Sequence, residues 1–531
     1  MLKLGSPALT ATFLGPSSLG SLPPRLSLAD RAAVSQSTPM SPSLAAIHSI
    51  PPAKLAAPTA EGRRLRRRLL RGTVVVVIVA GYQGKRFIYE RAKELGVRLV
   101  ILDADDSWAS ELVDAGIVEK FYVTDLSDQD TVFDNCMAGI RRAEREIGQV
   151  DGVLSFWELS QPLVSRLAER LGLPANPPEA VDSAREKQRT REVMGAAGLP
   201  TPKNTIIRSP KDLAKAAAHV GFPAVLKPIS GAASLGVIRV NSEPDLHTLY
   251  TQVCKEVASV TRNAEGGLET KSVAPNEEVI EEQHTGQAYV AQRFMLETYL
   301  DGPEVDVDIA LSQGDVIYGA VTDNWPTIEP YFNETGSNCP SILPHQQQMD
   351  LCDLAVASVK ALGFEEGVLH VELKYTSHGP QLIEINARMG GGPVHMINHM
   401  VWGVDLVEEQ LLSTVGIPSR PYLARSAQVQ LAENSINAKA TGRLQRDDFC
   451  EEWDGQEDVV YCRPLVKAGD SVTSVEDGLP TWVCEVMVTK PTMEKALEYV
   501  RKVESDIDSI IKITPAAQNA RAQQAVPDCL S

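Results

Sequence analysis

The stretch QLIEINARMGGG, residues 381–392, reads as a buried strand that carries three polar side chains. Successive side chains of a strand point to opposite faces. Glu384, Asn386 and Arg388 therefore share one face, and apolar residues alternate with them on the other. Burying polar groups without partners is costly, so this grouping indicates a functional site.

A second strand precedes this stretch, VLHVELKY at residues 368–375, and the residues between the two favour a turn. If the strands form a hairpin centred on His378, Glu372 faces Glu384. Directly opposed carboxylates repel each other and weaken a hairpin. A divalent cation between them reverses the sign of this interaction.

Glu372, Glu384 and Asn386 are the candidate metal ligands on this hairpin, and the same register places Asn386 opposite His370. Their oxygen atoms are hard ligands, which suit Mg²⁺ or Mn²⁺ shared with substrate phosphates. The alternative is an exposed hairpin whose acidic residues are incidental. The metal interpretation also predicts a phosphate-binding element elsewhere in the chain.

Such an element is indicated by Lys227, which ends an apolar strand before a loop of small residues, 230–236. Small residues let backbone N–H groups approach phosphate oxygens, and the lysine adds a positive charge. The pattern is neither a Walker loop nor that of a protein kinase, and alone it is also compatible with a structural role. The candidate contacts in the loop are Ser230, Gly231, Ser234 and Gly236.

The first 72 residues differ in composition from the rest of the chain. They hold ten Lys or Arg and two acidic residues, so the net charge of −18 leaves −26 for the remainder. Such an acidic body lacks the basic face that nucleic-acid binding needs. A leader at 1–72 rich in Ser, Pro, Ala, Leu and Arg is typical of a transit peptide, with a disordered basic tail as the alternative. We expect a chloroplast or mitochondrial location, and otherwise a cytoplasmic one.

The composition is that of a globular protein of several domains, with 43% hydrophobic and 23% charged residues among 531. The eight cysteines lack the spacings of a zinc site, and they do not suggest a disulfide framework. The longest apolar run, residues 74–80, is too short to cross a membrane. We expect neither a membrane nor a nucleic-acid partner, and we leave a homodimer open.

Residues 73–180 alternate buried strands with helices and predict a parallel α/β domain that starts at Thr73. Gly81, Gly84 and Asp103 stand where a dinucleotide fold holds its phosphate turn and ribose carboxylate. The fingerprint lacks a glycine, which makes dinucleotide binding the weaker alternative. The rest of this α/β and α+β chain is expected to form a nucleotide- and metal-binding domain at 181–420, an α+β region at 421–515 and a disordered tail at 516–531.

An ordered set of motifs resembles the ATP-grasp superfamily across residues 73–515. The motifs are Lys187 before GLPTP, AVLKP with its glycine loop, ETYLDGPE from Glu297, HVELKYT from His370 and LIEINARMGGG from Leu382. The resemblance implies an ATP-grasp fold preceded by a parallel α/β domain. It also implies ATP and Mg²⁺, or Mn²⁺, as cofactors.

The same resemblance implies a role for each matching position. Arg388 would stabilise the transferring phosphoryl group and the tetrahedral intermediate. Glu372, Glu384 and Asn386 would carry the Mg²⁺ ions. The positions implied for ATP are Lys187 and Lys227 at the phosphates, the loop 231–236 over them, Glu297, Tyr299 and Leu300 along the adenine, and Glu304 at the ribose.

Within the superfamily, the runs YLDGPEVDVD at 299–308 and VTDNWPT at 321–327 are similar to the carnosine synthases, with bacterial L-amino-acid ligases close behind. The resemblance implies an ATP-dependent carboxylate–amine ligase that forms a peptide bond through an acyl phosphate and releases ADP. Small carboxylates and amines would be its partners. The alternatives are a ligase or carboxylase with another acceptor, such as ammonia, bicarbonate or a nucleotide precursor, and a non-catalytic ATP-binding module.

Four further residues are candidates for substrate contact. Glu334 would meet a substrate ammonium, although a surface-loop role competes with this interpretation. Related ligases often carry Glu-x-Gly-His here, whereas Ser337 takes the last place in this chain, so the identity of the substrate is open. Gly391 and Gly392 would let substrate approach the backbone.

Overall fold

The computed structural model describes residue 44 and residues 46–128, 130–229, 234–262, 268–270 and 293–515. The chain divides into two compact units. The first runs to Asp323 and includes Cys339–Gln428, and the second comprises Asn324–Asn338 and the residues from Val429. Residues 324–338, assigned from the sequence to the 181–420 domain, thus group with the C-terminal region. Among the described residues, no helix combines the length and apolar character of a membrane span.

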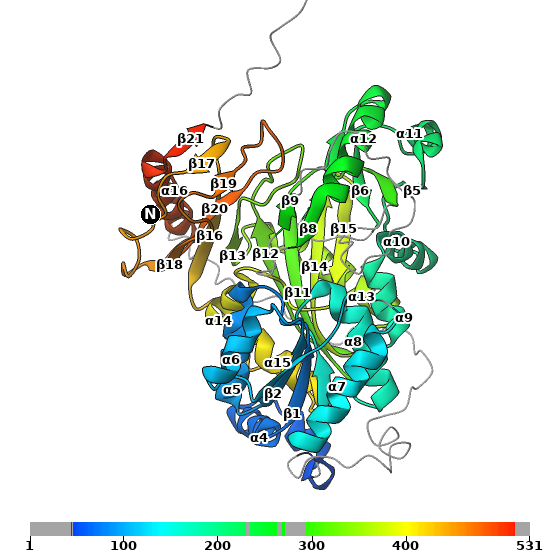
Figure 1. Cartoon of the computed structure of the whole chain (residues 1–531), viewed down its shortest axis with the longest axis vertical. Coiled ribbons are helices and arrows are strands. Elements are labelled where there is room, and N and C mark those ends of the chain that lie inside the picture. Colours follow the sequence, from blue (N-terminus) through cyan, green and yellow to red (C-terminus); the bar gives the residue numbers. More distant parts are fainter. Residues whose placement is uncertain are drawn as a thin grey trace, which may run out of the picture. The chain divides into compact units, whose positions relative to one another are not determined.

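The first unit begins with the predicted parallel sheet, in the strand order β3-β2-β1-β4. Its elements are β1 Val74–Ile78, α5 Arg86–Leu95, β2 Arg98–Asp103, α6 Glu111–Asp114, β3 Lys120–Val123, α7 Val132–Glu146, β4 Gly152–Leu154 and α8 Gln161–Leu171. Figure 1 shows α7 and α8 on one side of these strands and α5 on the other. Because helices cover both faces, β1 is buried along its length, which explains its run of valines and isoleucine.

The carboxylate of Asp103 stabilises the end of β1. One of its oxygens accepts hydrogen bonds from the backbone N–H of Ala80 at 2.9 Å and from the Ser107 hydroxyl at 2.8 Å. The side chain is buried. Asp103 therefore holds the turn in place, which gives it a structural role instead of the ribose contact of a dinucleotide fold.

The prediction that folded structure starts at Thr73 is wrong. Helices α3 Pro52–Leu55 and α4 Ala60–Leu70 precede the sheet. The Arg66 guanidinium in α4 is buried and donates hydrogen bonds to the carbonyl groups of Leu55 and Ala57, both at 2.9 Å. The basic run folds because its charges find acceptors within the protein. Residues 1–43 and 516–531 lie outside the described residues, so the predictions for those segments remain predictions.

The rest of the first unit contains two further sets of strands. One has the order β5-β10-β6-β7, and the other, β15-β14-β11-β12, is antiparallel between β11 and β14 and between β14 and β15. The strands are β5 Asn204–Ile207, β6 Ala224–Pro228, β7 Ile238–Val240, β10 Phe294–Thr298, β11 Glu304–Ser312, β12 Asp315–Asn324, β14 Gly367–Thr376 and β15 Gly379–Asn386. The helices are α9 Pro178–Arg185, α10 Lys187–Ala196, α11 Leu213–Val220, α12 Glu243–Ser259, α13 His345–Ala361, α14 Val394–Trp402 and α15 Leu406–Thr414. Two strands, β8 Val260–Arg262 and β9 Leu268–Thr270, form a separate pair.

The core of this part explains the alternation seen in β11 and β14. Val305, Val307 and Ile309 are buried against Leu369 and Val371 in one apolar cluster that also includes residues of α13. The polar residues between them consequently point to the opposite face of the sheet. That face carries the candidate active site.

The second unit has an antiparallel core covered by one long helix. Its strands are β13 Gly336–Cys339, β16 Gln430–Asn437, β17 Gly442–Leu444, β18 Val459–Pro464, β19 Ser471–Val472, β20 Trp482–Lys490 and β21 Ile513–Pro515, and its helix is α16 Met493–Ile510. Ala496, Val500, Val503 and Ile507 of α16 are buried at intervals of three or four residues. This spacing gives the helix one apolar face, which packs in the unit's core.

Candidate active site

The hairpin of β14 and β15 brings the predicted metal ligands together. Glu372 lies opposite Glu384, and His370 lies opposite Asn386, which confirms the predicted register at these positions. The two carboxylates therefore face each other on the polar side of the sheet.

The turn of the hairpin differs from the prediction. Thr376 pairs with Gly379, so the turn contains two residues and is not centred on His378. A register shift between Glu372 and Leu373 corrects the resulting offset. Such a bulge adds one residue to one strand, and here it restores the pairing of the carboxylates.

The pKa values of the two carboxyl groups shift in opposite directions. Burial and the nearby Glu384 raise the pKa of Glu372 well above its usual range. Burial also opposes ionisation of Glu384, but the Lys187 ammonium, 2.5 Å away, outweighs it and lowers the pKa of Glu384 to about 2. The Asn386 side-chain N–H donates to Glu372 Oε1 at 3.1 Å. The negative charge of Glu384 thus opposes the ionisation of Glu372.

This arrangement fits a divalent cation. The raised pKa of Glu372 means that ionising it beside Glu384 is unfavourable without additional positive charge. Mg²⁺ supplies such charge and prefers carboxylate and amide oxygens together with phosphate oxygens. Among the described residues, no group of three or more His, Cys, Asp or Glu side chains is arranged to hold a metal. Two glutamates and an amide would consequently need oxygen ligands from a substrate or water.

A network of acids around His370 supports the hairpin and was not assigned a role from the sequence. Its Nδ1 lies 2.8 Å from Asp308 Oδ1, and its Nε2 lies 3.7 Å from Asp306 Oδ1. Burial disfavours a charged ring, but these carboxylates raise the pKa of His370 to about 10. The sequence feature that could have indicated this network is the alternation of acidic residues in EVDVDIA of β11. A Cβ on Gly390 would lie 2.7 Å from His370 Nδ1, so the glycine allows this close approach.

The lysine that ends β6 belongs to a buried charge cluster. Lys227 Nζ lies 2.5 Å from Glu297 Oε1, and the Arg191 guanidinium donates to Glu297 Oε2 at 2.7 Å. Burial raises the pKa of Glu297, but the two cations outweigh it and lower the value to about 2. Arg191, one turn after Lys187 on α10, was not recognised from the sequence. The Glu297 carboxylate positions these cations, in addition to the backbone role expected for this residue.

The other positions expected at the nucleotide lie around the same strands. Glu304 Oε2 is 3.5 Å from Lys374 Nζ, and the Arg239 guanidinium lies 4.3 Å from the centre of the Tyr299 ring. Leu300 directly follows this tyrosine. Among the loop residues, Ser234 and Gly236 both adopt positive φ, while Ser230 and Gly231 lie outside the described residues.

Arg388 contacts the N-terminal α/β domain. Its Nε lies 2.9 Å from Glu158 Oε2, in a short 3-10 helix after β4. Its remaining nitrogens donate to the Met389 carbonyl at 2.9 Å and to Asn386 Oδ1 at 3.3 Å. Glu158 was missed because 230 residues separate it from Arg388. The guanidinium is therefore held between the metal ligands and the parallel sheet.

The glycine run after Arg388 meets the turn that follows β1. The Gly392 N–H donates to the Tyr82 hydroxyl at 3.5 Å, and a Cβ on Gly391 would lie 3.8 Å from that oxygen. Both glycines expected to contact substrate thus face a side chain of the N-terminal domain.

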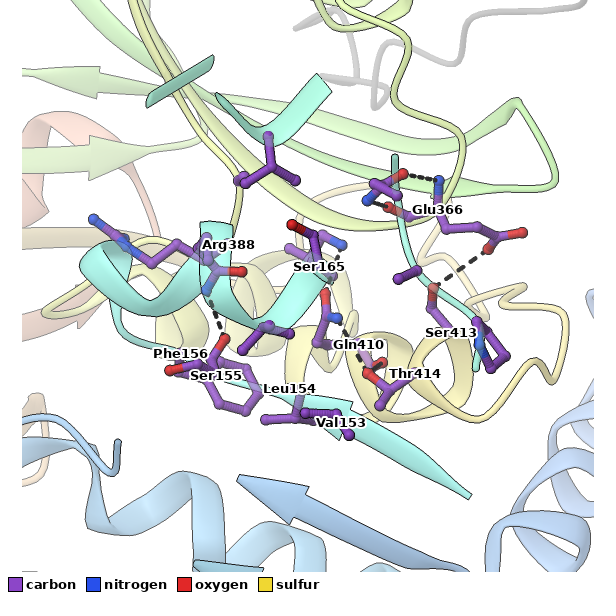
Figure 2. A pocket seen from close by; sticks show the side chains of 18 of the residues that line it. Val153, Leu154, Ser155, Phe156, Ser165, Glu366, Arg388, Gln410, Ser413 and Thr414 are labelled. Atoms are coloured by element: carbon purple, nitrogen blue, oxygen red, sulfur yellow. Dashed lines mark hydrogen bonds between the residues drawn. The ribbon is translucent and has the colours of Figure 1, made fainter. Parts of the chain in front are cut away.

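A cavity of about 60 Å³ adjoins Arg388 on its other side (Figure 2). Its polar lining groups bond to one another: the Ser413 hydroxyl donates to Glu366 Oε2 at 3.3 Å, and the Gln410 amide donates to the Thr414 hydroxyl at 3.3 Å. The volume suits a few water molecules and is far too small for a nucleotide. The cavity therefore does not hold the nucleotide, although Arg388 lines it.

The remaining substrate candidates, Glu334 and Ser337, belong to the second unit. The Glu334 carbonyl accepts hydrogen bonds from Trp482 Nε1 at 2.9 Å and Asn437 Nδ2 at 3.2 Å. Ser337 is buried on β13. The structure thus brings the metal, phosphate and arginine positions together in the first unit, while a substrate role for Glu334 or Ser337 stays a prediction.

Two segments of this chain match family models of known domains. The family model of the ATP-grasp N-terminal domain matches residues 89–175, and that of the ATP-grasp domain matches residues 268–396. The solved structure of L-amino acid ligase from Bacillus licheniformis matches with a TM-score of 0.67 and 20% identity, covering 84% of this chain and 99% of that chain. At this identity the likeness shows the fold alone, which is the ATP-grasp fold named by the matching family models.

Two curated relatives are also similar. Carnosine synthase 1 of Gallus gallus is 32% identical over 394 residues, which cover 72% of this chain and 39% of the relative. Alanine–anticapsin ligase of Bacillus subtilis strain 168 is 25% identical over 264 residues, covering 50% of this chain and 53% of the relative. The chain thus spans about two fifths of the chicken protein's length.

Proposed function

The chain has the ATP-grasp fold, and from this premise we propose that it is an ATP-dependent ligase that joins two amino acids through an amide bond. The observation that carries the proposal is the placement of Arg388 beside the opposed pair Glu372 and Glu384. A guanidinium at this point can stabilise the negative charge that develops on the transferred phosphoryl group. The likeness to carnosine synthase 1 and alanine–anticapsin ligase supports amino acids as the substrates.

The described residues fit the charge requirements of this reaction. ATP held with Mg²⁺ would phosphorylate the carboxylate of one substrate, and the amine of the other would then displace phosphate to form the amide. Glu372, Glu384 and Asn386 would hold the cation. Arg388 has a planar fork that can hold two oxygens while negative charge develops. The mechanism needs positioned charges more than it needs a protein base.

The proposal is tested by measuring ADP release from the purified protein with a panel of amino-acid pairs, followed by mass spectrometry of the products. ADP is expected only when a carboxylate and an amine are both present, together with a product that has lost one water. Release of AMP and pyrophosphate would contradict the acyl-phosphate route. ADP formation with ammonia or bicarbonate as the acceptor would instead support the alternative ligase.

We also propose that the chain enters an organelle and that any processing spares α4. Arg63 and Arg67 in this helix bind the buried carboxylate of Glu408. Cleavage at residue 72 would remove both arginines and leave that carboxylate without them. Sequencing the N-terminus of the mature protein should therefore reveal a start upstream of Ala60. A mature start at residue 73 would contradict this expectation.

A further inference from the structure

Lys85 is a buried lysine that forms no ion pair with any of the described carboxylates. Only 5% of the residue is exposed. It stands in the turn after β1, and its Nζ lies 5.2 Å from the centre of the Tyr82 ring. Lysine is almost never fully buried without a partner, so this position calls for a functional explanation.

The turn that carries Lys85 is tightly constrained. Val79 adopts a φ of 62°, which is unfavourable for a β-branched residue. A Cβ on Gly81 would lie 2.9 Å from Lys85 Cδ and 3.4 Å from the Trp157 ring, so the glycine makes room for the lysine stem. Strained backbone of this kind persists where the surrounding structure enforces it, often at functional sites. The lysine is thus held in place.

The charges around Lys85 do not balance. The charged groups that act on it are Arg388 and Glu158, and Glu158 already pairs with Arg388 at 2.9 Å. Two cations therefore share one carboxylate. Burial and Arg388 accordingly lower the pKa of Lys85 to about 7, although Glu158 opposes this shift. An additional anion beside Lys85 would restore the balance and stabilise its charged form.

We propose that Lys85 binds the carboxylate of the amine-donating amino acid, next to Arg388. This inference rests on the proposed function and names the residue that selects one of its substrates. A ligase of this kind consumes the carboxylate of one amino acid but leaves that of the other unchanged. The retained carboxylate keeps its charge throughout the reaction and needs a permanent cation once it is enclosed. Tyr82 contacts both the Lys85 ammonium, through its ring, and the Gly392 N–H, through its hydroxyl, so Lys85 can serve this group from the N-terminal domain.

The test compares free amino acids with their carboxamides as amine donors in the intact protein. L-Alanine, L-histidine and L-arginine, each with its carboxamide, would be assayed with the wild type and with Lys85→Met and Lys85→Gln. The wild type is expected to favour the free acids by roughly 10- to 100-fold in kcat/KM, the usual effect of a buried charge-assisted hydrogen bond. Both variants should lose this preference through a higher KM for the free acids, while values for the carboxamides stay within about twofold.

Lys93 supplies the matched control, because it lies on the adjoining helix α5 and is exposed. Lys93→Met should behave like the wild type. A wild type without preference for the free acids, or variants that keep the preference, would overturn the assignment of Lys85.

A binding experiment separates this inference from the proposed function. Calorimetric titration of the same compounds in the presence of ADP and Mg²⁺ needs no ligation. If no pair is ligated, the proposed function fails, and the titration still decides the role of Lys85. Binding of free acids that is lost in Lys85→Met supports the role, whereas equal binding by both proteins, or none by the wild type, contradicts it.

Discussion

Replacing Arg388 by methionine is expected to reduce the rate of amide formation by roughly 100- to 1,000-fold, the usual loss when one donor to a developing negative charge is removed. Binding of ATP should change little, because Lys187 and Lys227 lie on other elements and keep their own carboxylate partners. The measurement is kcat for ADP release together with the Kd of a non-hydrolysable ATP analogue.

A matched control is Arg170→Met, which removes an exposed guanidinium from α8. This variant should retain the wild-type kcat. Arg388→Lys is a second informative variant, since an ammonium cannot hold two oxygens in a planar fork and should recover little activity. Unchanged turnover in Arg388→Met would remove the arginine from the mechanism.

Replacing Glu408 by glutamine should cause the largest loss of stability among the charge substitutions considered. Its carboxylate is fully buried and lies 2.7 Å from both Arg63 Nη2 and Arg67 Nη2. Breaking a buried ion pair typically costs 3–5 kcal/mol, and we expect about 2 kcal/mol here because Arg67 remains partly exposed to solvent. The midpoint of thermal unfolding should fall, and protease should cleave before Thr73 more readily.

The effect should depend on pH. Burial opposes ionisation of Glu408, but Arg67 and Arg63 outweigh it and lower the pKa of this carboxyl. The stabilisation is therefore present above the pKa that Glu408 has in the unfolded chain, and it is lost as the pH falls through the lower pKa that Glu408 has in the folded protein. The control is Glu94→Gln, because Glu94 is 65% exposed and its partner Arg91 keeps its ion pair with the buried Asp405. It should change stability by less than about 0.5 kcal/mol, and an equal loss in both variants would contradict the assigned role of Glu408.

The parts of the fold that depend on local patterns could be predicted from the sequence. The parallel sheet follows from its buried strands, and the shared face of Glu384 and Asn386 follows from the period of two in QLIEINA. The turn length could not be predicted, because the bulge after Glu372 leaves no clear mark in the sequence. Two opposite errors, a misplaced turn centre and an unseen bulge, cancelled at the carboxylates.

The features missed from the sequence depend on contacts between distant segments. Arg63 and Arg67 belong to a run that matches a leader in composition, and only the partner at Glu408 shows that they are structural. Glu158 and Lys85 occur in ordinary turn sequences. Glu158 is important because it pairs with Arg388, and Lys85 because the nearby charge of Arg388 lowers its pKa. Periodicity and spacing give information about residues that are close in the sequence. The partner of a buried charge often lies on a distant segment, so these patterns cannot predict it.

The bulge after Glu372 also affects which turn lengths this hairpin can tolerate. The bulge shifts the pairing of the two strands by one residue between the two-residue turn and Glu384, which places Glu384 opposite Glu372. Gain or loss of a residue at the tip can thus be offset by loss or gain of a bulge. A change in turn length that is offset in this way leaves Glu372 opposite Glu384.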